Sequence, residues 1–135
     1  MNLKHQKKLG RVVKVGDVNV WNHEDFIASA FSRLGFSVTF YPAHNSITSA
    51  DAYINRTLFE FKSPDGNRIK CVDNNLKKAL KNQSKCIVIC SIRLKNVTDR
   101  SVENHLREVI TKRPDIRRLY FVDKHGRVID IKNPL

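Results

Sequence analysis

Apolar residues recur along this chain at two periods, and the change from one period to the other predicts its helices and strands. Helical spacing of apolar residues covers three segments: 22–34, 71–83 and 101–113. Alternating or continuous apolar runs of strand length cover the segments 36–41, 51–54, 57–62 and 86–92, and a hairpin over 119–131 that turns at 124–126. The predicted order is an αβββαβ core with an appended αββ. This order indicates an α/β protein with a mixed sheet of the α+β type.

The N-terminal segment differs from the rest because basic residues dominate it. Residues 1–21 carry five of them, ahead of an alternating V-V-K-V-G-D-V-N-V stretch: Lys4, Lys7, Lys8, Arg11 and Lys14. We expect a basic N-terminal arm over 1–21, in which a turn at Gly16–Asp17 would allow a small hairpin. The remaining residues, 22–135, are expected to form a single domain, whose first helix has Asn22 as its candidate N-cap.

The segment 50–62, A-D-A-Y-I-N-R-T-L-F-E-F-K, predicts a β-hairpin with a two-residue loop at Asn55–Arg56. That loop pairs the flanking residues as follows: Ile54 with Thr57, Tyr53 with Leu58, Ala52 with Phe59, and Asp51 with Glu60. Opposed side chains share a face with Cβ atoms roughly 4.5–5.5 Å apart, and Lys62 projects from the same face as Glu60. The other face is apolar and fixes the register, through Ala52, Ile54, Phe59 and Phe61. The hairpin is therefore predicted to bring Asp51, Glu60 and Lys62 together.

Two carboxylates and an ammonium at one place suit metal-dependent chemistry on phosphates. Close carboxylates repel each other, and Mg²⁺, or another divalent cation such as Mn²⁺, offsets this repulsion by bridging them to waters and phosphate oxygens. The Lys62 ammonium can then orient or activate an attacking water, or offset charge that develops on the phosphate. The competing interpretation is a ladder of salt bridges on a solvated strand face.

The charge balance indicates the kind of partner. The chain of 135 residues has 25 Lys+Arg against 13 Asp+Glu, so its formal net charge is +12, which favours a polyanion. Nucleic acid is the leading partner, and no membrane is expected because no apolar run approaches the length of a transmembrane span. Three cysteines, Cys71, Cys86 and Cys90, lack the spacing of zinc ligands. Cys86 and Cys90 flank an apolar strand, where we expect them to be buried.

A carboxylate on one strand, Glu-x-Lys on the next and a helix upstream resemble the PD-(D/E)XK nuclease superfamily, over roughly residues 22–92. More closely, D-A-Y-I-N-R-T-L-F-E-F-K-S-P, the helix K-K-A-L-K-N-Q-S-K and the strand C-I-V-I resemble the C-terminal tRNA-nuclease domains of contact-dependent growth inhibition (CdiA-type) toxins. The resemblance implies a restriction-endonuclease-like fold and metal-dependent RNA cleavage. It implies Glu24, Asp51 and Glu60 as metal ligands, and these three with Lys62 as catalytic residues. Relatives often have Gly where this chain has Arg56, and Gly takes the left-handed conformation of a turn residue more readily than Arg does.

Several of the implicated residues have a second interpretation. Glu24 is equally a first-turn carboxylate that offsets the helix dipole. The candidate substrate contacts are Ser63, Lys77, Lys78, Lys81 and Gln83. Ser63 either touches a phosphate or caps the turn at Pro64. Gln83 lies on the predicted apolar stripe of the helix 71–83, where a buried amide needs a partner. The three lysines suit contacts with the substrate backbone, or a solvated face.

Histidines and aromatic residues supply the remaining alternatives. A histidine pair serves as acid and base in metal-free RNases, but the histidines here are scattered and none has an evident partner: His5, His23, His44, His105 and His125. Trp21 and Tyr53 are either base-stacking residues or ordinary core and rim packing.

Together these observations predict a metal-dependent endoribonuclease that cleaves tRNA as the toxic effector domain of an interbacterial growth-inhibition system. Two alternatives stay open, a PD-(D/E)XK DNA endonuclease and a non-catalytic basic module that binds nucleic acid. Such a toxin would act in the cytoplasm of the bacterial target cell, delivered as the C-terminal part of a larger secreted or cell-surface protein. Its producer would need a cognate immunity protein, for which an acidic surface is the natural complement.

Overall fold

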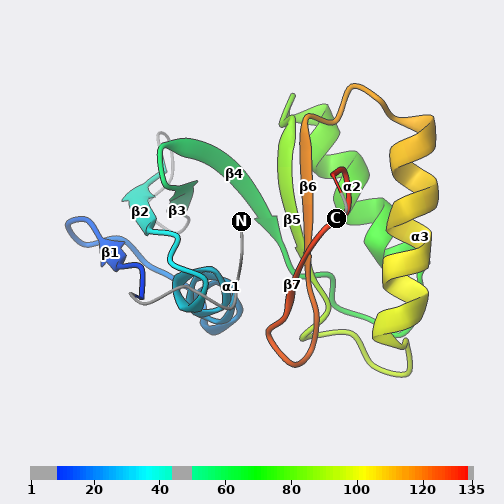
Figure 1. Cartoon of the computed structure of the whole chain (residues 1–135), viewed down its shortest axis with the longest axis horizontal. Helices are drawn as coiled ribbons and strands as arrows, with labels where there is room; N and C mark the ends of the chain where they lie inside the picture. Colours follow the sequence, from blue (N-terminus) through cyan, green and yellow to red (C-terminus); the bar gives the residue numbers. More distant parts are fainter. Residues whose placement is uncertain (1–8, 44–49, 134–135) are drawn as a thin grey trace. The chain divides into compact units, whose positions relative to one another are not determined.

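The computed structural model describes residues 9–43 and 50–133, and in this part of the chain seven strands and three helices form (Figure 1). The elements follow in the order β1 (Val12–Lys14), α1 (Asn22–Arg33), β2 (Val38–Pro42), β3 (Ala50–Ile54), β4 (Thr57–Lys62), α2 (Lys70–Lys81), β5 (Cys86–Cys90), α3 (Asp99–Lys112), β6 (Arg118–Val122) and β7 (Val128–Asp130). The strands pair in sequence order in one mixed sheet. The predicted αβββαβ core and appended αββ are confirmed, and β1 precedes them. None of the described helices is long and apolar enough to cross a membrane.

The chain divides into two compact units, Met1–Phe59 and Glu60–Leu135, and the division falls inside β4. The first half of β4 pairs antiparallel with β3, from Thr57 to Phe59. The second half pairs in parallel with β5, from Glu60 to Lys62. Each unit therefore has three residues of β4 in its ladder.

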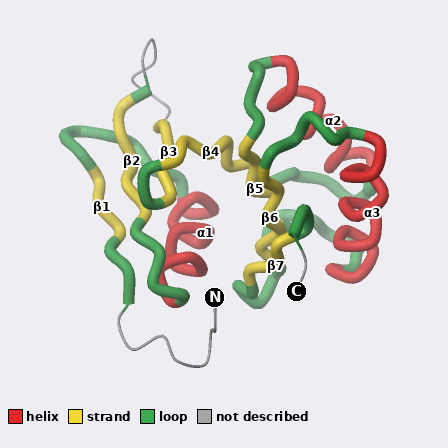
Figure 2. The backbone as a smooth tube through the Cα atoms, turned by 45° about the horizontal axis from the view of Figure 1, so that its top comes forward, coloured by secondary structure: helices red, strands yellow, loops and turns green. Residues whose placement is uncertain are grey.

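The first unit packs α1 against its strands, in contact with β1 and β2 (Figure 2). The helix buries a stripe at helical spacing and the strands bury alternate residues: Ile27, Ala28, Ala30, Phe31, Val38, Phe40, Ala52, Ile54 and Phe59. Trp21, and not Asn22, is the N-cap, because the Trp21 carbonyl accepts hydrogen bonds from the N–H groups of Glu24 and Asp25 at 3.0 Å each. Asn22 is the first helical residue, which corrects the predicted cap by one position.

Strand β1 corrects the prediction for the N-terminal segment. Val12–Lys14 pairs in parallel with β2, so within the described residues 9–21 no hairpin forms at Gly16–Asp17. The chain does turn there, with Gly16 in the left-handed region at φ +60°. Just before β1, Gly10 passes so close to the Phe36 carbonyl that any Cβ would collide with its oxygen. This close approach requires glycine at position 10.

The hairpin of β3 and β4 has the predicted two-residue loop. Its ladder pairs Ile54 with Thr57, Tyr53 with Leu58, and Ala52 with Phe59, as predicted, and the fourth predicted pair, Asp51 with Glu60, is not part of it. Asn55 takes the left-handed conformation at φ +55° and Arg56 does not, so the loop does not need Gly at position 56. Asn55 also bonds to Ser37: its N–H donates to the Ser37 carbonyl at 2.6 Å, and its Oδ1 accepts from the Ser37 N–H at 3.1 Å.

The second unit centres on β5, which is parallel to β4 and β6, while β7 runs antiparallel to β6. Helices α2 and α3 pack on one face of these strands (Figure 1, Figure 2). The core between them consists of apolar residues: Val72, Leu76, Ala79, Ile87, Ile89, Leu94, Val102, Leu106, Ile116, Leu119, Phe121 and Ile131. Cys86 and Cys90 are buried, as predicted. Burial raises the pKa of the Cys90 thiol to about 12, so the thiol stays neutral and unreactive.

The end of α2 differs from the prediction. The helix stops at Lys81, and Gln83 follows it in the left-handed conformation at φ +63° with an exposed side chain. The Ser84 N–H donates to the Ala79 carbonyl at 3.0 Å, which closes the last turn. Gln83 therefore does not lie on the apolar stripe, and its amide is not buried.

Asp123 organises the turn between β6 and β7, which falls at the predicted position. Its buried carboxylate accepts hydrogen bonds from the N–H groups of His125 and Arg127 at 2.9 Å each, and from Arg127 Nε at 2.7 Å. Burial alone would raise the pKa of Asp123, but these hydrogen bonds outweigh burial and hold the pKa below its usual value. The carboxylate therefore stays ionised and keeps the turn closed.

Candidate functional site

Glu60 and Lys62 form the ion pair at the centre of the predicted site. The two residues are two positions apart on β4, so they share a face, and Lys62 Nζ lies 3.2 Å from Glu60 Oε1. Pairing of Glu60 with Ile87 and of Lys62 with Ile89 on β5 holds their backbones. The Glu60 side chain is 31% exposed and the Lys62 side chain 22%, so a ligand can reach both. The predicted contact of Glu60 with Lys62 is confirmed.

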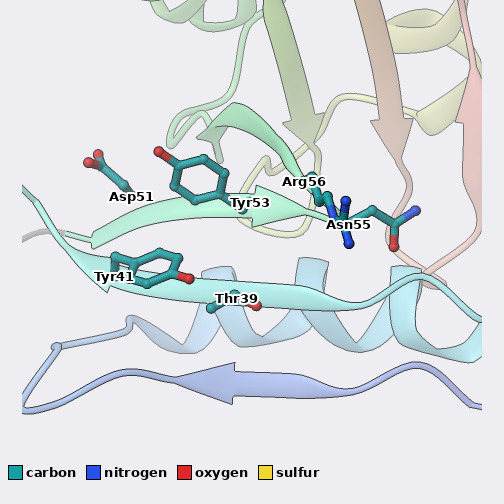
Figure 3. Close-up of a pocket in the computed structure, with 6 residues that line it drawn as sticks. All are labelled: Thr39, Tyr41, Asp51, Tyr53, Asn55 and Arg56. Atoms are coloured by element: carbon teal, nitrogen blue, oxygen red, sulfur yellow. The ribbon is translucent and has the colours of Figure 1, made fainter.

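Asp51 lies on the open face of the first unit. It is directly opposite Tyr41 on β2, while Phe40 and Ala52, which point to the other face, are buried. With five neighbours it lines a hollow of about 370 Å³ (Figure 3): Thr39, Tyr41, Tyr53, Asn55 and Arg56. None of the described residues forms a hydrogen bond or an ion pair with the Asp51 carboxylate. A carboxylate of this kind can bind a cation or a hydrogen-bond donor on a ligand.

Glu24 has a role in starting α1. Its Oε1 accepts a hydrogen bond from the Trp21 N–H at 2.9 Å, which supports the cap at Trp21. Burial raises the pKa of the Glu24 carboxyl above its usual value, although the hydrogen bond from Trp21 acts in the opposite direction. The helix-start interpretation of Glu24 is thus supported, and it occupies one of the two carboxylate oxygens.

The three predicted metal ligands are divided between the two units. Glu24 and Asp51 are in the first unit, and Glu60 is in the second. Among the described residues, no three His, Cys, Asp or Glu side chains form a group that could hold a metal ion. Carboxylate oxygens are the donors that a hard cation such as Mg²⁺ prefers, so the donor type fits. The metal site and the contact of Asp51 with Glu60 stay predictions.

The candidate substrate contacts lie in the second unit and differ in accessibility. Lys77, Lys78 and Lys81 are exposed on α2, and none of them forms an ion pair with a described residue. The Ser63 hydroxyl oxygen is buried beside the Cys90 thiol and has no nitrogen or oxygen partner among the described residues, so it neither caps the Pro64 turn nor faces solvent. Gln83 is exposed beyond the end of α2. The lysines are the members of this set that a phosphate can reach directly.

One histidine has a partner that the sequence analysis missed. His105 Nε2 lies 2.6 Å from Asp73 Oδ1, which joins α3 to α2. His23 stacks on Trp21 with ring centroids 6.1 Å apart. His5 and His44 lie outside the described residues. A single His–Asp pair between two helices does not supply the acid and base that a metal-free RNase needs, so the histidine alternative gains no support.

The hollow beside Asp51 contains residues that the sequence analysis did not single out, Thr39 and Tyr41. The only signal was the strand alternation of 38–41, which puts Thr39 and Tyr41 on the face opposite Val38 and Phe40. This signal could not show which strand would lie beside β2. Recognition of the hollow needed the pairing of Thr39 with Tyr53 and of Tyr41 with Asp51.

Comparison with known proteins places these features in a family. Residues 48–128, more than half of the chain, match the family model described as Contact-dependent growth inhibition CdiA C-terminal domain. A solved structure, the CdiA-CT/CdiI toxin and immunity complex from Burkholderia pseudomallei, superposes with a TM-score of 0.65 at 17% identity, covering 90% of this chain and 99% of that chain. At this identity the similarity shows the fold alone. No curated protein sequence matches the chain.

The two interpretations of Glu24 can be separated by stability. We expect Glu24→Gln to keep the free energy of unfolding at neutral pH, because the amide oxygen can still accept from the Trp21 N–H and no charge is then buried. Glu24→Ala removes the acceptor and should lower the free energy of unfolding by about 0.5–1.5 kcal/mol. Urea unfolding followed by circular dichroism measures both variants. Equal losses in the two variants would contradict the hydrogen-bonding role.

Proposed function

Because this chain belongs to the CdiA C-terminal domain family of contact-dependent growth inhibition, we propose that it is a toxic effector domain that cleaves tRNA as a metal-dependent endoribonuclease. The observation that carries the proposal is the Glu60–Lys62 pair, 3.2 Å apart and open to a ligand on β4. The similarity of the motif to PD-(D/E)XK nucleases gives this pair its proposed chemistry. The formal net charge of +12 favours a polyanionic substrate such as RNA.

Lys62 is the proposed catalytic cation. Its ammonium lies 3.2 Å from the Glu60 carboxylate, and it can offset negative charge that develops on the phosphate or orient the attacking water. Pairing with β5 fixes the backbone of Lys62, so the ammonium is positioned before the substrate arrives. Loss of this group should therefore affect the rate more than the binding of RNA.

Asp51 and Glu60 are the proposed ligands of Mg²⁺, with Glu24 as a further candidate through its second oxygen. The carboxylate type of all three fits a hard cation, and the Asp51 oxygens have no described partner. When bound, the cation would supply Lewis-acid polarisation of a phosphoryl oxygen. Mn²⁺ has the same ligand preference and is the proposed substitute.

Substrate affinity is proposed to come mainly from Lys77, Lys78 and Lys81. All three ammonium groups lie on the exposed side of α2, in the same unit as Lys62. Lysine contacts to phosphate carry affinity without sequence choice. Ser63 and Gln83 are weaker candidates, since the Ser63 oxygen is buried and Gln83 lies beyond the helix.

A second candidate function is a non-catalytic basic module that binds nucleic acid. The ion pair of Glu60 with Lys62 is compatible with this function, because opposite charges two residues apart on a partly exposed strand face often form a salt bridge that has no catalytic role. Cleavage of any nucleic acid separates the two candidates. Cleavage of duplex DNA in place of RNA would keep the site and change the substrate.

We expect purified protein with Mg²⁺ to cut total bacterial tRNA into discrete fragments, and EDTA to abolish the cutting. Lys62→Ala should reduce the cleavage rate by about 10²–10³-fold, as loss of a charge-stabilising donor does in other enzymes. Lys112→Ala, an exposed lysine in the last turn of α3, is the matched control and should cleave normally. Plasmid DNA is tested in parallel. If Lys62→Ala cleaves like the native protein while both are folded, the catalytic assignment is wrong.

The lysines of α2 have their own test in the Lys62→Ala background, where the RNA stays intact. Each of Lys77→Ala, Lys78→Ala and Lys81→Ala should weaken tRNA binding and reduce the slope of log affinity against log salt by about 0.7–0.9. Fluorescence anisotropy across a salt series measures this slope. Lys112→Ala again serves as the control. An unchanged slope in all three variants would show that α2 does not contact the phosphates.

We propose that this domain is delivered as the C-terminal part of a larger secreted or cell-surface protein, acts in the target-cell cytoplasm, and is blocked by a cognate immunity protein. The solved relative is a toxin and immunity complex. A protein with a net charge of +12 needs an acidic partner surface for fast and selective association.

The immunity protein should be an acidic protein. We expect it to co-purify with the tagged Lys62→Ala variant, to stop tRNA cleavage by the native protein, and to bind more slowly as salt increases. Co-purification, a cleavage assay and stopped-flow association measure these three properties. Recovery of only neutral or basic partners that leave cleavage unchanged would contradict this prediction.

A further inference from the structure

The open face of β2 and β3 carries two aromatic rings beside Asp51. Tyr41 and Tyr53 form an edge-to-face pair, with ring centroids 5.4 Å apart and planes at 86° (Figure 3). In such a pair each ring leaves at least one side uncovered by the other. Tyr41 is 44% exposed. The pair therefore presents an aromatic surface to solvent.

Polar groups surround this aromatic surface. Four polar residues line the hollow of about 370 Å³ together with the two tyrosines: Thr39, Asp51, Asn55 and Arg56. Its volume lies near the lower end of small-ligand sites, roughly 300–1,000 Å³. Figure 3 shows Asp51 at one end of β3, and Asn55 and Arg56 at the loop end. A planar ligand with hydrogen-bonding edges matches such a lining, because its faces can stack and its edges can bond.

The charge of the chain narrows the class of ligand. A net charge of +12 attracts polyanions, and Arg56 at the hairpin loop puts a cation next to the aromatic pair. Nucleobases are the planar groups that polyanions carry, and aromatic side chains stack on bases of any sequence. An unpaired base leaves its own stack at the lowest cost, because no base pair has to be broken.

We propose that this hollow seats one unpaired nucleobase of the RNA substrate, with Tyr41 as the main stacking surface. The proposal rests on the proposed nuclease function, because Asp51, one of the proposed metal ligands, borders the hollow. The enzyme would then select single-stranded nucleotides, in loops or at ends, over the interior of a duplex. Tyr41 and Tyr53 are binding residues in this scheme and not catalytic ones.

The test measures binding in EDTA and in the Lys62→Ala background, so that cleavage plays no part. The probes are a fluorescein-labelled single-stranded oligouridylate and a blunt RNA duplex of equal length, at one fixed salt concentration. Tyr41→Leu keeps an apolar side chain but removes the ring, and should weaken single-strand binding by about 5- to 100-fold while duplex binding stays the same. Tyr41→Phe keeps the ring and should bind the single strand like the parent. Tyr53→Leu is the second variant, and circular dichroism confirms that each variant is folded.

Equal affinity of Tyr41→Leu and the parent for the single strand would overturn the proposal. Equal weakening of single-strand and duplex binding would also overturn it, because stacking requires an unpaired base. If Tyr41→Leu lost immunity-protein binding but kept RNA binding, the hollow would be assigned to a protein partner, and the base-site proposal would be overturned. The predicted pattern in a protein that cleaves no RNA would support the base site while removing the nuclease proposal. Cleavage by the native protein together with unaltered binding by Tyr41→Leu would remove the base site alone.

Discussion

The alternation of side chains along β4 is the constraint on which the candidate site depends. Antiparallel pairing with β3 and then parallel pairing with β5 fix the register of this strand. The register directs Phe59 into the core and leaves Glu60 and Lys62 on the other face, partly exposed. A slip of one residue would move Phe59 out of the core, which costs more free energy than a surface ion pair returns. Burial of the apolar face therefore positions the pair, and the attraction between Glu60 and Lys62 only refines it.

Most of the fold could be predicted because its elements have strong local patterns. The helices α1, α2 and α3 each bury a stripe that the helical period of apolar residues indicates. The errors occur where local pattern does not decide. Gln83 continues the period of α2, but a left-handed residue after Lys81 ends the helix earlier. The strand β1 was visible as alternation, yet its parallel partner β2 comes after a whole helix, and no short-range signal identifies that pairing.

Only the part of the candidate site that lies on a single strand could be predicted from the sequence. Glu60 and Lys62 are neighbours on one strand, so a period of two was sufficient to bring them together. The hollow beside Asp51 depends instead on the pairing of β2 with β3, elements joined by the segment 43–49, and its aromatic pair could not be inferred from either strand alone. Glu24 shows a further limit. A carboxylate in the first turn of a helix suits both a cap and a ligand, and only the position of the Trp21 N–H reveals the hydrogen bond that it makes.

The two kinds of recognition proposed here differ in what they can distinguish. Lysines on α2 and the overall charge hold any polyanion, and salt screens them, so they cannot separate RNA structures from one another. Stacking on Tyr41 is also tolerant of sequence, but it needs a base that is free of its own partner. If both act, the substrate would be chosen by its structure, and sequence would matter little at the level of this domain. Selection of one particular tRNA would then require contacts that recognise its overall shape, or hydrogen bonds from the polar lining of the hollow to the edge of the seated base, because lysine contacts and stacking do not read the identity of a base.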